Sequence, residues 1–251
     1  MTMKLFLILV ILLHGFSNTV GQSIMIAAAA DLRFVLDEAV KTFKETNPKI
    51  KIDIIYGSSG NLFQQISNQA PIDLFFSADN SYPLKLEELG LTGNKPKVYA
   101  IGRLVIWSAT KDVTRGLDLL RSDDVKKISI ANPDIAPYGK KAVECLKYFK
   151  LYELVKDKIV KGDNVSQAAQ FVLTGNAEVG IIALSLALSP EMKGIGKYFL
   201  IDEKSYSKLE QSYVILKRSE NNIDVLKFTK FLESEELKKC FSKYGFKLPK
   251  H

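Results

Sequence analysis

Four turns in the sequence carry residues that suit the binding of an oxyanion through backbone N–H groups. Each turn joins an apolar, strand-like run to an amphipathic segment, so it places a helix N-terminus at the end of a strand. The first N–H groups of a helix have no partner inside the helix, and small side chains leave them accessible to an anion. The four turns contain Ala30-Asp31, Ser58-Ser59-Gly60, Pro137-Tyr138-Gly139 and Asn164-Val165.

The second of these turns shows the pattern most clearly. Residues 52–56 are β-branched or aromatic except for Asp53, which is typical of a largely buried strand. A Gly-Ser-Ser-Gly break follows, and Leu62, Phe63 and Ile66 then recur at helical spacing. The hydroxyls of Ser58 and Ser59 stand beside the helix N–H groups. Taken alone, this turn is better explained as an ordinary helix cap, and the case for an anion site rests on the same architecture recurring in the other three turns.

Electrostatics favour an anion over an uncharged ligand. Each helix N-terminus carries about half a positive charge, so four that face one cavity would supply about +2. This matches a doubly charged tetrahedral oxyanion without help from lysine or arginine. Because the donors would be fixed backbone groups, the geometry of the ligand would decide selection more than its net charge.

Several other chemistries are excluded by composition. The only histidines are His14 and His251, so there is no internal histidine for a Ser-His-Asp triad, a Cys-His pair or a histidine metal site. Asp53, Asp73 and Asp79 lack metal-ligand spacing, and we expect no metal site. The formal net charge is +7, but the lysines are scattered, so no nucleic-acid partner is expected.

The N-terminus is predicted to be a secretory signal peptide. Lys4 precedes an apolar run at residues 5–13 that is too short to span a bilayer, and small or polar residues follow. We expect cleavage near Gly21 and, because no cysteine lies near that site, no lipid anchor. The mature chain is therefore expected to be exported, soluble and periplasmic.

The remaining sequence alternates strands and helices. This βαβ rhythm predicts parallel sheets with helices on their faces. It is interrupted at residues 98–109, a long extended run that contains Gly102, and residues 212–216 are extended again. We interpret these two runs as crossings between two α/β lobes, with the first lobe at residues 22–102 and 212–251 and the second at 103–211. Cys145 and Cys240 then fall in different lobes and are expected to be free thiols.

Seven motifs in order resemble the periplasmic molybdate-binding proteins of ABC importers, which have the type II periplasmic binding protein fold. They cover nearly all of residues 23–246. The motifs are AAAADL (27–32), YGSSGNL (56–62), PIDLFFSAD (71–79), NPDIAPYGKKA (132–142), GDNVSQA (162–168), EVGIIALS (178–185) and KYGF (243–246). The resemblance implies two lobes, each a mostly parallel sheet flanked by helices, joined by two extended crossings.

The resemblance also implies roles for individual residues. Ser59 would give its hydroxyl and N–H to the oxyanion, and Tyr138 and Val165 would give backbone N–H groups. Ser58 is a further candidate ligand, although its hydroxyl is equally able to cap the helix. One branch of the family supplies a tyrosine hydroxyl where this chain has Ala183, and the phenol of Tyr138 could compensate. Lys140 and Lys141 are expected to face solvent.

Asp31 departs from the family, where many members have Ser or Asn at this position. A carboxylate beside a dianion is repelled. The side chain could cap the N–H of Arg33 or Phe34, it could be protonated and donate a hydrogen bond, or it could accept the O–H of a protonated oxyanion. We prefer the cap, because it satisfies the carboxylate within its own helix.

The expected function is therefore capture of molybdate, and of tungstate as well, between two hinged lobes of a monomer, for delivery to a membrane ABC permease. No cofactor is expected, and the chain is not expected to be an enzyme. The alternatives are a binding protein for phosphate, sulfate or a small organic anion, and an exported hydrolase that uses Ser58 or Ser59 as nucleophile.

Overall fold

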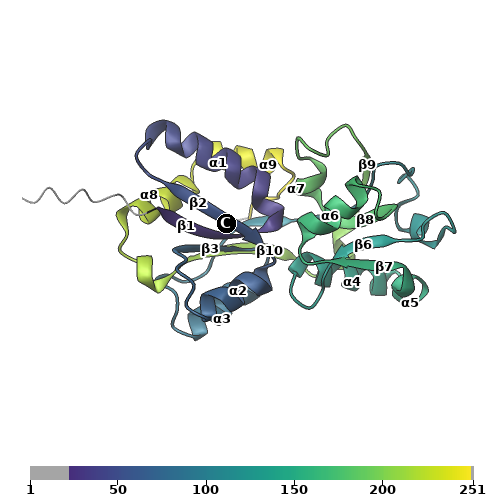
Figure 1. The fold of residues 1–251 in the computed structure, drawn as a ribbon, viewed down its shortest axis with the longest axis horizontal. Helices are drawn as coiled ribbons and strands as arrows, with labels where there is room; N and C mark the ends of the chain where they lie inside the picture. The colour runs from purple at the N-terminus through teal and green to yellow at the C-terminus, as the bar shows by residue number, and fades with distance from the viewer. Residues whose placement is uncertain (1–22, 250–251) are drawn as a thin grey trace, which may run out of the picture.

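The computed structural model describes residues 23–249 and has two lobes, each built on a five-stranded sheet (Figure 1). The predicted signal peptide lies outside these residues. In the first lobe the strands are β1 (Ile24–Ala29), β2 (Ile52–Gly57), β3 (Leu74–Ser77), β4 (Lys97–Gly102) and β10 (Leu209–Ile215). In the second they are β5 (Leu104–Ser108), β6 (Ile128–Ala131), β7 (Ile159–Gly162), β8 (Val179–Ala183) and β9 (Lys197–Leu200).

The two sheets have the same topology. Their strand orders are β2-β1-β3-β10-β4 and β7-β6-β8-β5-β9. In each sheet one strand runs against the other four: β10 is antiparallel to β3 and β4, and β5 is antiparallel to β8 and β9. The mostly parallel sheets predicted from the sequence are thus present. The reversed strand of each sheet is the one that directly follows a crossing.

The chain passes twice between the two sheets. β4 ends at Gly102 in the first sheet, and β5 starts at Leu104 in the second, so only Arg103 separates them. The return passes from β9 through a short 3₁₀ turn (Glu203–Ser205) into β10, which begins three residues before the predicted run. Any hinge motion between the lobes would have to bend the chain at these two crossings.

Amphipathic helices cover the sheets because their apolar faces need burial. In the first lobe, α1 (Arg33–Thr46), α8 (Ile223–Phe231) and α9 (Glu235–Lys243) lie on one face, and α2 (Ser59–Ser67) and α3 (Ser81–Glu88) on the other (Figure 1). In the second lobe, α4 (Pro137–Tyr148) and α6 (Val165–Leu173) pack on β6, with α5 (Tyr152–Val155) and α7 (Leu184–Ala187) nearby.

The two cysteines lie in different lobes and do not form a disulfide. Cys145, on α4, is buried and Cys240, on α9, is half-buried, and both are free thiols. Within residues 23–249, no helix is long and apolar enough to cross a membrane.

Candidate oxyanion site between the lobes

The carboxyl ends of parallel strands from both lobes converge on one small cavity. The first lobe lines it with the turns that follow β1, β2 and β3, and the second with the turns that follow β6 and β7. All five residues predicted from the sequence line this cavity: Asp31, Ser58, Ser59, Tyr138 and Val165. About 10 Å³ is open to the centres of oxygen-sized atoms. This is about the room that one water molecule needs, so the cavity is too small for a sugar or a peptide.

The turn after β2 holds its two serines by different hydrogen bonds. Ser58 is the N-cap of α2, and its hydroxyl accepts a hydrogen bond from the N–H of Asn61 at 3.3 Å. Ser59, the first helical residue, is 1% exposed, and its hydroxyl accepts from the N–H of Ala78 at 3.0 Å. Because Ser59 Oγ already accepts, its own proton is the one left for a ligand.

Two turns of the second lobe aim helix N-termini at the same cavity. α4 begins at Pro137, a residue that suits a first helical position because its φ is fixed and it has no N–H to leave unpaired. α6 begins at Val165, and the Asn164 side chain caps it by accepting from the N–H of Gln167 at 3.0 Å. Among residues 23–249, nothing accepts a hydrogen bond from the backbone N–H of Ser59, Tyr138 or Val165.

The preferred role of Asp31 as a helix cap is wrong. A 3₁₀ turn (Ala30–Leu32) intervenes, α1 starts only at Arg33, and its N-cap is Leu32. Neither helix start has a side-chain cap. The carboxylate points instead into the interior, where Oδ2 accepts a hydrogen bond from Nε2 of Gln211 on β10. The extra turn moves the side chain away from the N–H groups of Arg33 and Phe34.

Asp31 is almost completely buried, with 1% of its surface exposed. This burial raises the pKa of its carboxyl to about 6, although the hydrogen bond from Gln211 and the nearby phenol of Tyr138 act in the opposite direction. Gln211 Nε2 also donates to the phenol oxygen of Tyr138 at 3.2 Å. A Cβ on Gly102 would lie 2.3 Å from that oxygen, so the Tyr138 phenol rests against the crossing strand. Asp31 and the Tyr138 phenol thus belong to one buried polar network at the crossing.

Besides the bond from Gln211 to Tyr138, three hydrogen bonds tie the lobes together around the cavity, and the sequence analysis missed all of them. The N–H of Gly60 donates to the carbonyl of Ile135 at 2.8 Å. The Ser166 hydroxyl donates to the carbonyl of Ala30 at 2.9 Å, and the Ser185 hydroxyl to that of Asp31 at 2.8 Å. Both serines lie in motifs that carry the resemblance, but nothing in their spacing reveals these long-range partners. The lobes are therefore in contact across the site.

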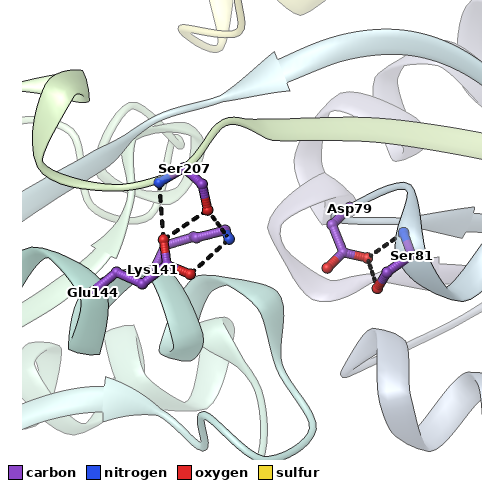
Figure 2. Close-up of polar contacts among 5 residues, drawn as sticks. All are labelled: Asp79, Ser81, Lys141, Glu144 and Ser207. Carbon is purple, nitrogen blue, oxygen red and sulfur yellow. Dashed lines mark hydrogen bonds and ion pairs between the residues drawn. The ribbon is translucent and has the colours of Figure 1, made fainter.

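The expectation that both Lys140 and Lys141 face solvent is wrong for Lys141. Lys140 is exposed, but Lys141 is buried, and its ammonium binds Glu144 at 2.9 Å and the hydroxyl of Ser207 (Figure 2). Glu144 in turn accepts from the N–H and the hydroxyl of Ser207. This cluster fastens α4 to the segment that returns to the first lobe. The lysine side chain is therefore directed away from the cavity.

The donor set around the cavity is made of neutral groups and one carboxyl. No lysine or arginine is among the residues found to line it, and residues 23–249 contain no cluster of three or more His, Cys, Asp or Glu side chains. Ala183, where one branch of the family has a tyrosine, is fully buried at the end of β8. The arrangement offers hydrogen-bond donors at helix N-termini together with the single carboxyl of Asp31.

Comparison with known proteins finds relatives over nearly the whole chain. The model of bacterial extracellular solute-binding proteins matches residues 24–247. The molybdate-binding protein ModA of Azotobacter vinelandii is 33% identical over 231 residues, which is 91% of each chain. A putative ABC transporter substrate-binding lipoprotein of Bacillus subtilis, YvgL, is 32% identical over 89% of this chain and 86% of its own. The solved structure of the A. vinelandii periplasmic molybdate-binding protein superposes with a TM-score of 0.85 at 28% identity, covering 91% of this chain and all of that one.

Proposed function

This chain belongs to the family of bacterial extracellular solute-binding proteins, and from that premise we propose that it captures molybdate in the cavity between its lobes. Relatives that carry the name molybdate-binding protein match nearly its whole length. The family consists of binding proteins rather than enzymes, so the hydrolase alternative is set aside. We propose the same location as for the family, outside the cytoplasmic membrane, with residues 1–21 removed on export.

The observation that carries the proposal is a set of N–H groups around one small cavity that have no acceptor among the described residues. Ser59 supplies one from the first lobe, and Tyr138 and Val165 supply two from the second. Buried N–H groups without partners are rare because each costs free energy. An oxyanion that accepts from all three would satisfy them, and the helix N-termini would stabilise its charge.

The Ser59 hydroxyl adds a side-chain donor to these amides. Its oxygen accepts from the Ala78 N–H, so the hydroxyl proton is available for donation to the ion. Ser58 contributes through the helix cap that fixes the turn. Charge-assisted hydrogen bonds contribute roughly 1.5–3 kcal/mol each, so four such donors provide ample affinity after the cost of closure.

Capture is coupled to closure of the lobes. We propose that the two lobes move as separate bodies, residues 22–102 and 212–251 in one and 103–211 in the other as the sequence predicted, except that Leu209–Gln211 move with the first lobe because they belong to β10. The ion stabilises the closed form by accepting from both lobes. Tungstate, which has the same shape and charge, is expected to bind as well. Smaller oxyanions such as sulfate would bind less tightly, because backbone donors cannot follow them inward. The monomeric closed form would deliver the ion to a membrane ABC permease.

Calorimetry with the purified mature protein tests this function. Titrations with molybdate, tungstate, sulfate and phosphate under identical conditions should give tight one-to-one binding for the first two and much weaker binding for the others. Native mass spectrometry should show the mass of one oxyanion on the monomer. Preference for sulfate or phosphate would refute the proposal, and so would a folded protein that binds none of the four.

A further inference from the structure

One oxygen of Asp31 has no hydrogen-bond partner in the part of the chain that the structure describes. This atom, Oδ1, is completely buried, and the residue lines the proposed oxyanion cavity. A buried carboxylate oxygen without a partner is costly, and an anion in the same cavity would make it more so. The remaining contacts of Asp31 show how this cost is avoided.

The neighbouring amide fixes which carboxyl oxygen can carry a proton. The Tyr99 hydroxyl donates to Oε1 of Gln211 at 3.0 Å, so the amide of Gln211 must turn its NH₂ group toward Asp31 and Tyr138. Nε2 then donates to Oδ2 of Asp31. Oδ2 is therefore an acceptor, and a proton on this carboxyl belongs on Oδ1.

Within residues 23–249, no positive charge neutralises Asp31. The titratable groups that face it are the phenols of Tyr99 and Tyr138, and burial holds the pKa of both phenols well above the ordinary value, so they are neutral. Arg33, the nearest basic residue along the chain, has its guanidinium over the ring of Tyr56 at 5.1 Å. Among the described residues, none forms an ion pair with Asp31.

The helices of the second lobe that reach this turn also bring no charge to the carboxyl. They contribute the hydroxyls of Ser166 and Ser185, and each donates to a backbone carbonyl of the turn rather than to the carboxylate. Closure therefore surrounds Asp31 with neutral groups. Burial already raises its pKa to about 6, and a bound dianion would raise it further because like charges disfavour ionisation.

We propose that Asp31 takes up one proton from solvent when the lobes close on the oxyanion, and that Oδ1 then donates this proton to the ion as a hydrogen bond. The proposal rests on the proposed function and deepens it: this chain would bind molybdate together with a proton. Gln211 acts as a positioning residue, because it keeps Oδ2 an acceptor and so leaves Oδ1 as the donor. Affinity would then rise as the pH falls toward neutrality.

Calorimetry of molybdate binding in buffers of different ionisation enthalpy measures the protons taken up per ion. The parent protein should take up close to one proton at about pH 8, and its association constant should fall up to about tenfold per pH unit above neutrality. Asp31→Asn, which presents a fixed N–H donor at the same place, should take up none and should keep its affinity as the pH rises.

Asp79→Asn is the matched control. Asp79 follows Ala78 directly. Its carboxylate accepts hydrogen bonds from the N–H of Ser81 at 3.1 Å and from the Ser81 hydroxyl at 2.8 Å (Figure 2). This variant removes the same charge near the cleft and should keep the proton uptake of the parent. An infrared difference spectrum of the parent protein should show a carboxylic acid band appear with molybdate, and Asp31→Asn should lack that band.

Three outcomes would overturn the inference: binding without proton uptake, uptake that persists in Asp31→Asn, or an ionised Asp31 in the infrared spectrum of the complex. The first leaves molybdate capture intact and removes only the role of Asp31. Absence of molybdate binding at every pH would refute the proposed function itself, so the two failures are distinguishable.

Discussion

Gly60 lies where the lobes touch, and replacing it with alanine should oppose closure without harming the fold. A Cβ at this position would lie 2.7 Å from the carbonyl oxygen of Ile135 and 3.0 Å from its Cα. These are backbone atoms of the other lobe, so a side-chain rotation cannot remove the clash. The third contact, with the hydroxyl of Tyr82 at 2.8 Å, involves a side chain that can move.

The size of the effect follows from these contacts. Overpacking of this kind costs about 1–3 kcal/mol. The hydrogen bond from Gly60 to Ile135 would stretch as well, and its loss costs about 0.5–1.5 kcal/mol. Both costs fall on the closed form alone, so molybdate affinity should drop roughly tenfold to thousandfold. The free energy of unfolding of the ligand-free protein should stay level or rise by up to about 1 kcal/mol, because alanine favours a helix more than glycine does.

Calorimetry with molybdate and chemical unfolding without it measure the two quantities separately. Asn61→Ala is the control, since Asn61 is the next residue of the same helix and is exposed. Its affinity should match the parent. If Gly60→Ala binds molybdate as tightly as the parent does, this closed geometry is not the one that holds the ion, and the reasoning fails.

Three further variants probe the site and its supports. Ser59→Ala removes a hydroxyl donor and should weaken molybdate binding by roughly ten- to hundredfold in calorimetry, since a hydrogen bond to a charged group contributes about 1.5–3 kcal/mol; unchanged affinity would remove Ser59 from the site. Ser166→Ala and Ser185→Ala each remove one inter-lobe bond and should weaken binding by roughly two- to fifteenfold, with a more open ligand-bound form in small-angle scattering; wild-type scattering and affinity would contradict this. Glu144→Gln should lower the free energy of unfolding by about 1–3 kcal/mol at neutral pH. Although burial acts in the other direction, hydrogen bonds from Ser207 and Lys141 lower the pKa of the Glu144 carboxyl, so its contribution is present above the ordinary carboxyl pKa and is lost as the pH falls through the folded-state pKa. Urea unfolding at several pH values should therefore show the deficit vanish in acid, and a deficit independent of pH would rule out the charge as its cause.

Much of the fold could be predicted because its signals are local. The apolar run at residues 52–56 is β2, the spacing of Leu62 and Ile66 marks α2, and the glycine in the long run at 98–109 marks the crossing. β9 could not be found this way. All four of its residues are exposed, so the strand has no buried face to give it a pattern.

Only the backbone N–H groups of the site could be predicted from the sequence, because they lie at helix starts that the sequence pattern marks. Strand-to-helix turns show which N–H groups lack intrahelical partners, and these converge as expected. The cap assigned to Asp31 failed because one 3₁₀ turn redirects the side chain, and sequence patterns do not resolve a shift of one turn. The prediction that Lys141 faces solvent was wrong for a different reason. Its partner Ser207 lies 66 residues away, and only tertiary packing shows that a lysine next to an exposed one is buried.

The position of β10 has a consequence for how a newly made chain assembles. This strand, residues Leu209–Ile215, sits inside the first sheet between β3 and β4, whereas the second sheet uses only residues between Leu104 and Leu200. During synthesis the second sheet can be completed as soon as Leu200 has emerged. Until β10 arrives, β3 and β4 present unpaired backbone edges, the kind of surface that aggregates and that chaperones protect. The first lobe, whose strands β1–β4 are synthesised before the second lobe, therefore completes its sheet only after the second lobe has completed its own.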